Sequence, residues 1–189
     1  PASRGSRRVF AYLRGEHPHF RTVLSALAQA SASVLCVWPD ASEAAIAPFA
    51  AEPRMRIVRE PVQAAAALAQ ADAVVNYASS TFVCQTLLAG KPQLMLPTDH
   101  EKVMVGGRVA SLGLGVLCRK DAAATQVQEM TQALLEHTPM RDATQTIAAR
   151  YRSLCERASS VIGAALQRKC GARATTAARA ADCPCACSS

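Results

Sequence analysis

The stretch Ala71–Lys102, ADAVVNYASSTFVCQTLLAGKPQLMLPTDHEK, decides the fold of this chain. An apolar run at Ala73–Val75 predicts a buried strand, and a small, hydroxylated turn and a helix-forming segment closed by Gly90 follow it. A second apolar run, Leu94–Leu96, ends at Pro97 and a charged cluster. The order strand, turn, helix, strand, loop predicts a parallel sheet of the α/β class.

The turn before that helix contains Ser79, Ser80 and Thr81. Ligands of open parallel sheets bind at the carboxyl ends of the strands, and unpaired N–H groups at a helix N-terminus favour a phosphate. The turn therefore predicts a nucleotide pocket. The alternative is a simple helix cap, because Ser and Thr are preferred N-cap residues.

Hydrophobic periodicity predicts further elements on both sides of this stretch. We expect strands at Val9–Leu13, Val34–Trp38, Met55–Val58 and Val116–Cys118, and helices at Phe20–Gln29, Asp40–Phe49, Gln63–Gln70, from Lys102 past Leu112, from Asp121 to Pro139, and over 140–166. Asp40 or Ser42 would cap the second of these helices. Strands that alternate with helices predict a Rossmann-like, three-layer α/β fold with a parallel sheet.

The 189 residues suffice for one domain with a substantial core. We divide the chain into a basic lead-in (1–8), a nucleotide-binding domain (9–168) and a disordered tail rich in Ala, Arg and Cys (169–189). The chain does not begin with Met, and we expect a fragment or a processed form.

The formal net charge is +7, but the arginines have no interleaved aromatic residues and no nucleic-acid motif. We therefore expect no nucleic-acid partner. No apolar run is long enough to span a membrane, so we expect no transmembrane segment.

Four of the eight cysteines lie in apolar or helical runs and are expected to be buried in a reduced, cytoplasmic protein: Cys36, Cys84, Cys118 and Cys155. The tail cysteines Cys183, Cys185 and Cys187 are spaced too closely for a structural zinc site, so we expect no metal.

His17 and His19 follow the first strand on a loop and are expected to be exposed and solvated. Gly106 and Gly107 interrupt a predicted helix, either for close backbone packing or to admit a ligand.

The stretch Ala71–Lys102 and its flanking segments resemble the C-terminal, donor-binding half of a GT-B glycosyltransferase. The group in question is that of the UDP-glucosyl and UDP-glucuronosyl transferases and their bacterial relatives. The resemblance rests on Asp72 with its strand, on Leu88–Pro92 (LAGKP), on Gln93–Pro97, on Glu101 and on Arg108–Gly115 (RVASLGLG). It covers roughly residues 8–154 and implies one half of a GT-B fold.

The chain departs from that pattern at contacts the family uses for its donor. Tyr77 stands in place of a histidine, and Ala78 and Ser79 in place of two glycines. Gln85 replaces a glutamate and Lys102 replaces a glutamine. Each replacement changes which hydrogen bonds the site can make.

The resemblance implies binding of a nucleoside diphosphate sugar, UDP- or TDP-linked, without a cofactor. The implied donor-binding residues are Arg14, Val62, Tyr77, Ser79, Ser80, Thr81, Gln85, Asp99, His100, Glu101 and Lys102. Alternatively, Asp99 and Glu101 cap the following helix.

The family takes its acceptor, a small molecule, glycan or lipid, and its catalytic base from the N-terminal half, and no residue here is a convincing base. The expected activity is therefore hexosyl transfer completed by an N-terminal half or a partner chain. A non-catalytic subunit that docks to a partner is the second hypothesis, and a sugar-nucleotide epimerase is the third.

Overall fold

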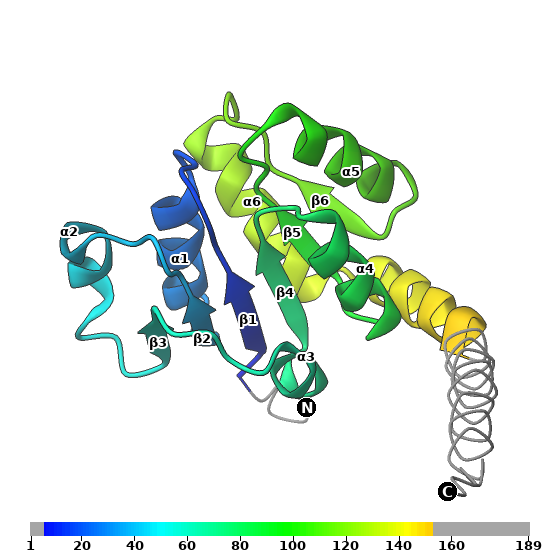
Figure 1. Ribbon diagram of the computed structural model, residues 1–189, viewed down its shortest axis with the longest axis horizontal. Coiled ribbons are helices and arrows are strands. Elements are labelled where there is room, and N and C mark those ends of the chain that lie inside the picture. The colour runs from blue at the N-terminus through cyan, green and yellow to red at the C-terminus, as the bar shows by residue number, and fades with distance from the viewer. Residues whose placement is uncertain (1–5, 153–189) are drawn as a thin grey trace, which may run out of the picture. The chain divides into compact units, whose positions relative to one another are not determined.

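The fold is centred on a six-stranded parallel sheet with the strand order β3-β2-β1-β4-β5-β6 (Figure 1). A computed structural model describes residues 6–152 of the chain. The strands are β1 Arg8–Tyr12, β2 Ser33–Val37, β3 Met55–Val58, β4 Ala73–Asn76, β5 Gln93–Met95 and β6 Gly115–Leu117. This is the strand order of a doubly wound Rossmann sheet, and the predicted fold class is confirmed.

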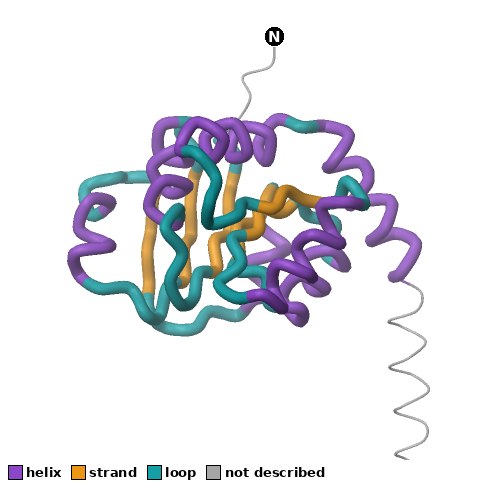
Figure 2. The backbone as a smooth tube through the Cα atoms, turned by 90° about the horizontal axis from the view of Figure 1, so that it is seen from above, coloured by secondary structure: helices purple, strands orange, loops and turns teal. Residues whose placement is uncertain are grey.

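Helices cover both faces of the sheet, which gives the three predicted layers (Figure 2). They are α1 Phe20–Gln29, α2 Glu43–Ile46, the 3₁₀ turn η1 Ala47–Phe49, α3 Ala64–Gln70, α4 Ser80–Leu88, α5 His100–Ser111 and α6 Ala124–Glu136. A further helix begins at residue 138 and continues to the end of the described residues.

One face of the sheet packs against α1 and α6. Side chains alternate along each strand, so Val9 and Ala11 point to this face while Phe10 points to the other. The α1 residues Leu24 and Leu27 are completely buried here. This face carries the largest apolar core of the domain.

The opposite face is covered by α3, α4 and α5 in two separate clusters. Phe10, Val74 and Phe82 form one of them, and Met95 and Val109 belong to the other. At the second cluster, a Cβ atom on Gly106 would lie 2.7 Å from Leu117 Cδ1. Close packing is therefore the role of that glycine.

The predicted boundaries differ from the structure mainly at element ends. The segment predicted as one helix at Asp40–Phe49 is α2 followed by η1, and Ser42 caps it by accepting a hydrogen bond from the Ala45 N–H. Asp40 instead accepts from the Gly15 N–H. The predicted break at Pro139 lies in the first turn of the next helix, where His137 Nδ1 accepts from the Met140 N–H.

Part of the predicted C-terminal organisation lies outside the described residues. This applies to the helix beyond residue 152, to the 169–189 tail and to Cys155. Within the described range no helix has the length and apolar composition needed to cross a membrane.

The cysteine prediction is confirmed at two positions and wrong at one. Burial raises the pKa of the Cys36 thiol to about 12 and that of Cys118 to about 11. Cys84 is exposed. It lies on the outward side of α4, because the helix buries its neighbours Phe82 and Val83 instead.

Candidate functional site

The strand order reverses between β1 and β4, so the loops that follow these two strands diverge to opposite faces of the sheet. Such a switch point leaves a crevice at the carboxyl ends of the strands. The loops after β1, β4, β5 and β6 border this edge. Together with the first turns of α4 and α5, they contain most of the residues that the sequence singled out.

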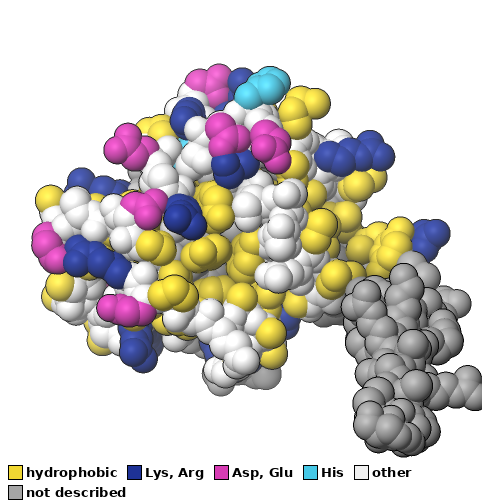
Figure 3. Space-filling view, viewed as in Figure 1, with side chains coloured by type: hydrophobic (Ala, Val, Ile, Leu, Met, Phe, Trp, Pro, Cys, Tyr) yellow, Lys and Arg dark blue, Asp and Glu magenta, His cyan; other side chains and the backbone are white. Residues whose placement is uncertain are grey.

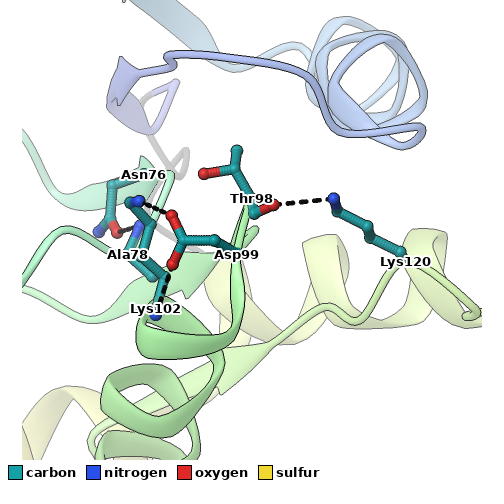
Figure 4. Close-up of polar contacts among 6 residues, drawn as sticks. All are labelled: Asn76, Ala78, Thr98, Asp99, Lys102 and Lys120. Atoms are coloured by element: carbon teal, nitrogen blue, oxygen red, sulfur yellow. Dashed lines mark hydrogen bonds and ion pairs between the residues drawn. The ribbon is translucent and has the colours of Figure 1, made fainter.

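The turn between β4 and α4 is held by a buried polar network. Asn76 Oδ1 accepts a hydrogen bond from the Ala78 N–H at 2.8 Å, and Asn76 Nδ2 donates to Gln93 Oε1 at 2.9 Å. Ala78 has φ +64°, a left-handed conformation that costs a non-glycine residue about 1 kcal/mol or more. The Asn76 side chain therefore fixes a strained turn directly before α4 (Figure 4).

The N-terminus of α4 has no side-chain cap. Ser79 occupies the N-cap position with an extended backbone, but its hydroxyl makes no capping hydrogen bond. The N–H groups of the first helical turn have no partner within a helix, and the helix dipole places positive charge there. The simple capping role considered for Ser79 is therefore wrong, and this helix end is available to an anion.

A cavity of about 260 Å³ lies beside this helix end and gathers several predicted residues. Its lining includes Val62, Tyr77, Ser79, Thr81 and Gln85. These residues come from the loop after β3, the β4–α4 turn and α4 itself. The tertiary structure thus brings Val62 next to a turn that lies 15 or more positions later in the sequence.

Aromatic rings form one wall of the same cavity. The Tyr12 ring packs edge-on against Tyr77 and Phe82, with centroid distances of 5.6 and 5.2 Å. Tyr12 was not among the predicted site residues. Its position at the carboxyl end of β1, next to the switch point, is the signal that would have found it.

The β5–α5 loop forms a second polar cluster. Asp99 caps α5 by accepting from the Lys102 N–H at 3.1 Å, and the same carboxylate pairs with the Lys102 ammonium (Figure 4). The hydrogen bonds from Lys102 hold the pKa of Asp99 below its usual value. Asp99 therefore has the helix-capping role that was given as its alternative.

Lys102 connects the two clusters. Its ammonium lies 5.8 Å from the centroid of the Tyr77 ring, within range of a cation–π interaction. Asp99 and His100 line a neighbouring cavity of about 330 Å³ with Lys120, whose ammonium donates to the Thr98 carbonyl at 2.8 Å. The Lys102 ammonium therefore lies between Tyr77, which lines the first cavity, and Asp99, which lines the second.

Four predicted residues line neither of these cavities: Arg14, Ser80, Glu101 and Lys102. Arg14, Ser80 and Glu101 are exposed, whereas Lys102 is half-buried between Asp99 and Tyr77. Lys120, which does line the second cavity, was not predicted. It lies in the loop that follows β6, three residues after Leu117, so the rule that places ligands at carboxyl ends of strands would have found it.

The prediction that His17 is exposed is wrong. Its side chain is 7% exposed and stacks on Phe20, and its Nδ1 accepts a hydrogen bond from the His19 N–H. Burial, with smaller contributions from His19 and Lys120, lowers the pKa of His17 to about 4. His17 is thus neutral near pH 7 and lines a further cavity of about 590 Å³ with Trp38.

Metal chemistry has no candidate in the described part of the chain. Among residues 6–152, no group of three or more His, Cys, Asp or Glu side chains is placed to hold an ion. The nearest sequence candidate, the cysteines at 183–187, lies outside that range.

Comparison with known proteins gives matches in structure only. No family model and no curated protein matches the sequence. The calicheamicin glycosyltransferase CalG4 superposes with a TM-score of 0.69 at 22% identity, over 89% of this chain and 44% of that one. SnogD from Streptomyces nogalater gives 0.64 at 20% identity, over 87% and 46%.

The glycosyltransferase VinC, solved in complex with DTDP, gives a TM-score of 0.66 at 19% identity, over 86% of this chain and 42% of that one. The chain therefore spans less than half the length of these glycosyltransferases. Its architecture is the Rossmann-like fold of one half of a GT-B glycosyltransferase.

Proposed function

We propose that this chain is the C-terminal, donor-binding domain of a glycosyltransferase of the UDP-glucosyl and UDP-glucuronosyl transferase type. It binds a nucleoside diphosphate hexose, UDP- or TDP-linked, for transfer to an acceptor hydroxyl. The observation that carries this proposal is the cavity in which Val62, Tyr77, Ser79, Thr81 and Gln85 meet beside an uncapped helix N-terminus.

The cavity has the chemistry to hold a nucleoside. Tyr12, Tyr77 and Val62 give the base flat and apolar surfaces, and a base binds well against aromatic rings. Gln85 brings a neutral amide to the same cavity, where it can hydrogen-bond to ribose hydroxyls. A glutamate would accept from both hydroxyls more strongly, because charged acceptors form the stronger bonds.

We assign the diphosphate to the N-terminal end of α4. The free N–H groups of the first turn, with the hydroxyls of Ser79 and Thr81, supply donors without a metal. Lys102 stands beside Tyr77 and adds a positive charge. These groups would stabilise the negative charge that develops on the departing diphosphate as the sugar is transferred.

The sugar is assigned to the second cavity, at Asp99 and His100. Asp99 already caps α5 and pairs with Lys102, so its carboxylate has less capacity for sugar hydroxyls than a free one. The catalytic base and the acceptor site are assigned to an N-terminal half or a partner chain.

Calorimetric titration tests this function. The purified chain is titrated with UDP, TDP, GDP and their glucose conjugates. We expect saturable binding of one nucleotide series, weakened roughly tenfold by Ser79→Ala combined with Thr81→Ala, since lost hydrogen bonds to a charged group cost about 1.5 kcal/mol. Ser111→Ala, at the far end of α5, is the matched control and should leave affinity unchanged.

A second variant tests the ribose contact separately. Gln85→Glu should tighten nucleoside binding about fivefold if the ribose hydroxyls lie against this side chain. Absence of binding by every nucleotide would overturn the proposal. In that case the non-catalytic docking subunit becomes the better explanation of this fold.

A further inference from the structure

The sheet face that carries α3 is incompletely covered over β1, β2 and β3. Leu35 lies in the middle of β2 on this face and is only half-buried, whereas its neighbours Val34 and Cys36, on the opposite face, are 3% and 0% exposed. Parallel sheets are normally covered on both faces. Figure 3 shows apolar side chains across the middle of this side of the molecule.

The uncovered face forms a groove of about 530 Å³ along α3. In-register pairing places Phe10, Leu35 and Arg56 in one row across the three strands, with all three side chains on the same face. Val62 and Ala66 border the groove from the α3 side. The floor is apolar over β1 and β2 and ends at the Arg56 side chain on β3.

The charge around the groove has one sign. Arg8, Arg54 and Arg56 line it, and its lining includes no Asp or Glu. Arg8 lies 3.7 Å from the Asp72 carboxylate, and Arg54 donates to the Ser31 carbonyl at 3.1 Å. Within residues 6–152, Arg54 and Arg56 form no ion pair.

The rest of the chain does not match this surface in charge. Residues 153–189 contain five Lys or Arg and two Asp or Glu, so they are basic themselves. A second copy carries the same net charge of +7. An apolar floor beside unpaired guanidinium groups instead matches a segment that combines apolar side chains with carboxylates.

We propose that this groove docks an acidic amphipathic helix of a partner protein. The apolar stripe of that helix would cover Leu35 and Ala66, and its carboxylates would pair with Arg54 and Arg56. The groove lies over the sheet face, whereas the nucleotide is assigned to the carboxyl edge. The two meet at Phe10 and Val62, which also line the cavity of about 260 Å³.

Fluorescence anisotropy with a defined peptide tests the docking surface. The probe is a labelled synthetic helix with Leu at positions i, i+3, i+4 and i+7 and Glu at most other positions. We expect saturable binding to the full chain that weakens at least tenfold in Arg54→Glu with Arg56→Glu, and that weakens with added salt. The same peptide with Lys in place of Glu should not bind.

The control separates the groove from the net charge. Arg21→Glu with Arg108→Glu makes the same charge change at exposed positions outside the groove and should bind the peptide like the original chain. Far-UV circular dichroism checks that both double variants are folded. If Arg54→Glu with Arg56→Glu is not folded, Arg54→Gln with Arg56→Gln replaces it.

Three results would overturn the proposal. These are equal weakening in the groove and control variants, no saturable binding of the acidic peptide, and binding only to phosphatidylglycerol vesicles, which would mark a membrane surface instead. None of them depends on nucleotide binding, so this surface and the proposed function fail separately.

Discussion

The two faces of the sheet are built differently over β1 and β2. On one face α1 covers the strands, and Leu24 and Leu27 are fully buried against them. On the other face the seven residues of α3 leave Tyr12 and Leu35 half-buried. The face under α1 is a packed apolar core. The face under α3 is only partly covered, and it contains the cavity assigned to the nucleotide and the groove assigned to a partner.

The difference shows how one sheet combines stability with recognition. A side chain that is fully buried stabilises the fold in proportion to the apolar area it removes from water. A half-buried side chain contributes less to folding but keeps apolar area available for binding. The following changes test this division between the two faces.

The largest expected effect is loss of stability on the covered face. Leu24→Ala should lower the free energy of unfolding by about 3 kcal/mol, because it opens a cavity in a packed core. Leu35→Ala, the matched leucine of the uncovered face, should cost about 1 kcal/mol. Urea denaturation followed by circular dichroism measures both, and equal losses would mean that the two faces do not differ in packing.

The next effect concerns His17, which borders the covered face beside Phe20. Its pKa is about 4 in the folded chain and 6.5 when unfolded, so between these values the unfolded chain binds more protons. This contribution to stability is complete above pH 6.5 and is lost as the pH falls towards 4. The loss is roughly 1 to 3 kcal/mol.

Unfolding measured at several pH values, in parallel with His17→Gln, isolates that contribution. The variant should show a flatter dependence on pH between 4 and 6.5. An unchanged slope would mean that other groups produce the pH dependence.

The smallest effect compares two adjacent glycines on α5, which covers the opposite face at β5 and β6. Nothing lies within 4 Å of a Cβ atom on Gly107, so Gly107→Ala should stabilise the chain by about 0.5 to 1 kcal/mol through helix propensity. Gly106→Ala gains the same propensity but meets Leu117 at 2.7 Å. It should be about 1 kcal/mol less stable than Gly107→Ala in thermal unfolding.

If both variants stabilise the chain equally, α5 packs less tightly on β6 than described. The face would then be loosely covered along its whole width, and the contrast with the groove over β1–β3 would disappear.

Much of the fold was predictable because its signals are local. The bounds of α1 and β3 are those predicted, and in α1 the helical periodicity is strong, because its four regularly spaced apolar residues are all buried. The weaker segment at Asp40–Phe49 was predicted as one helix, but a proline at position 48 and few buried residues leave only α2 and η1. Local signals fail where packing provides little support.

The candidate site was predictable in part for the same reason. Ser79 and Thr81 follow a strand and precede a helix, so their place at the carboxyl edge follows from the sequence. His17 also lies on a loop at this edge, yet it is buried. It stacks on Phe20, which packs in turn on Trp38, and that tertiary contact is not revealed by loop position.

The sequence alone determined the alternation of strands and helices and the position of the β4–α4 turn, because the periodicity of apolar side chains records which local structure can bury them. Only the tertiary structure decided that β4 lies beside β1, that Tyr12 and Val62 therefore meet Tyr77, and that Leu35 is left partly uncovered. Pairing between distant strands depends on the packing of the whole sheet. No local pattern specifies it.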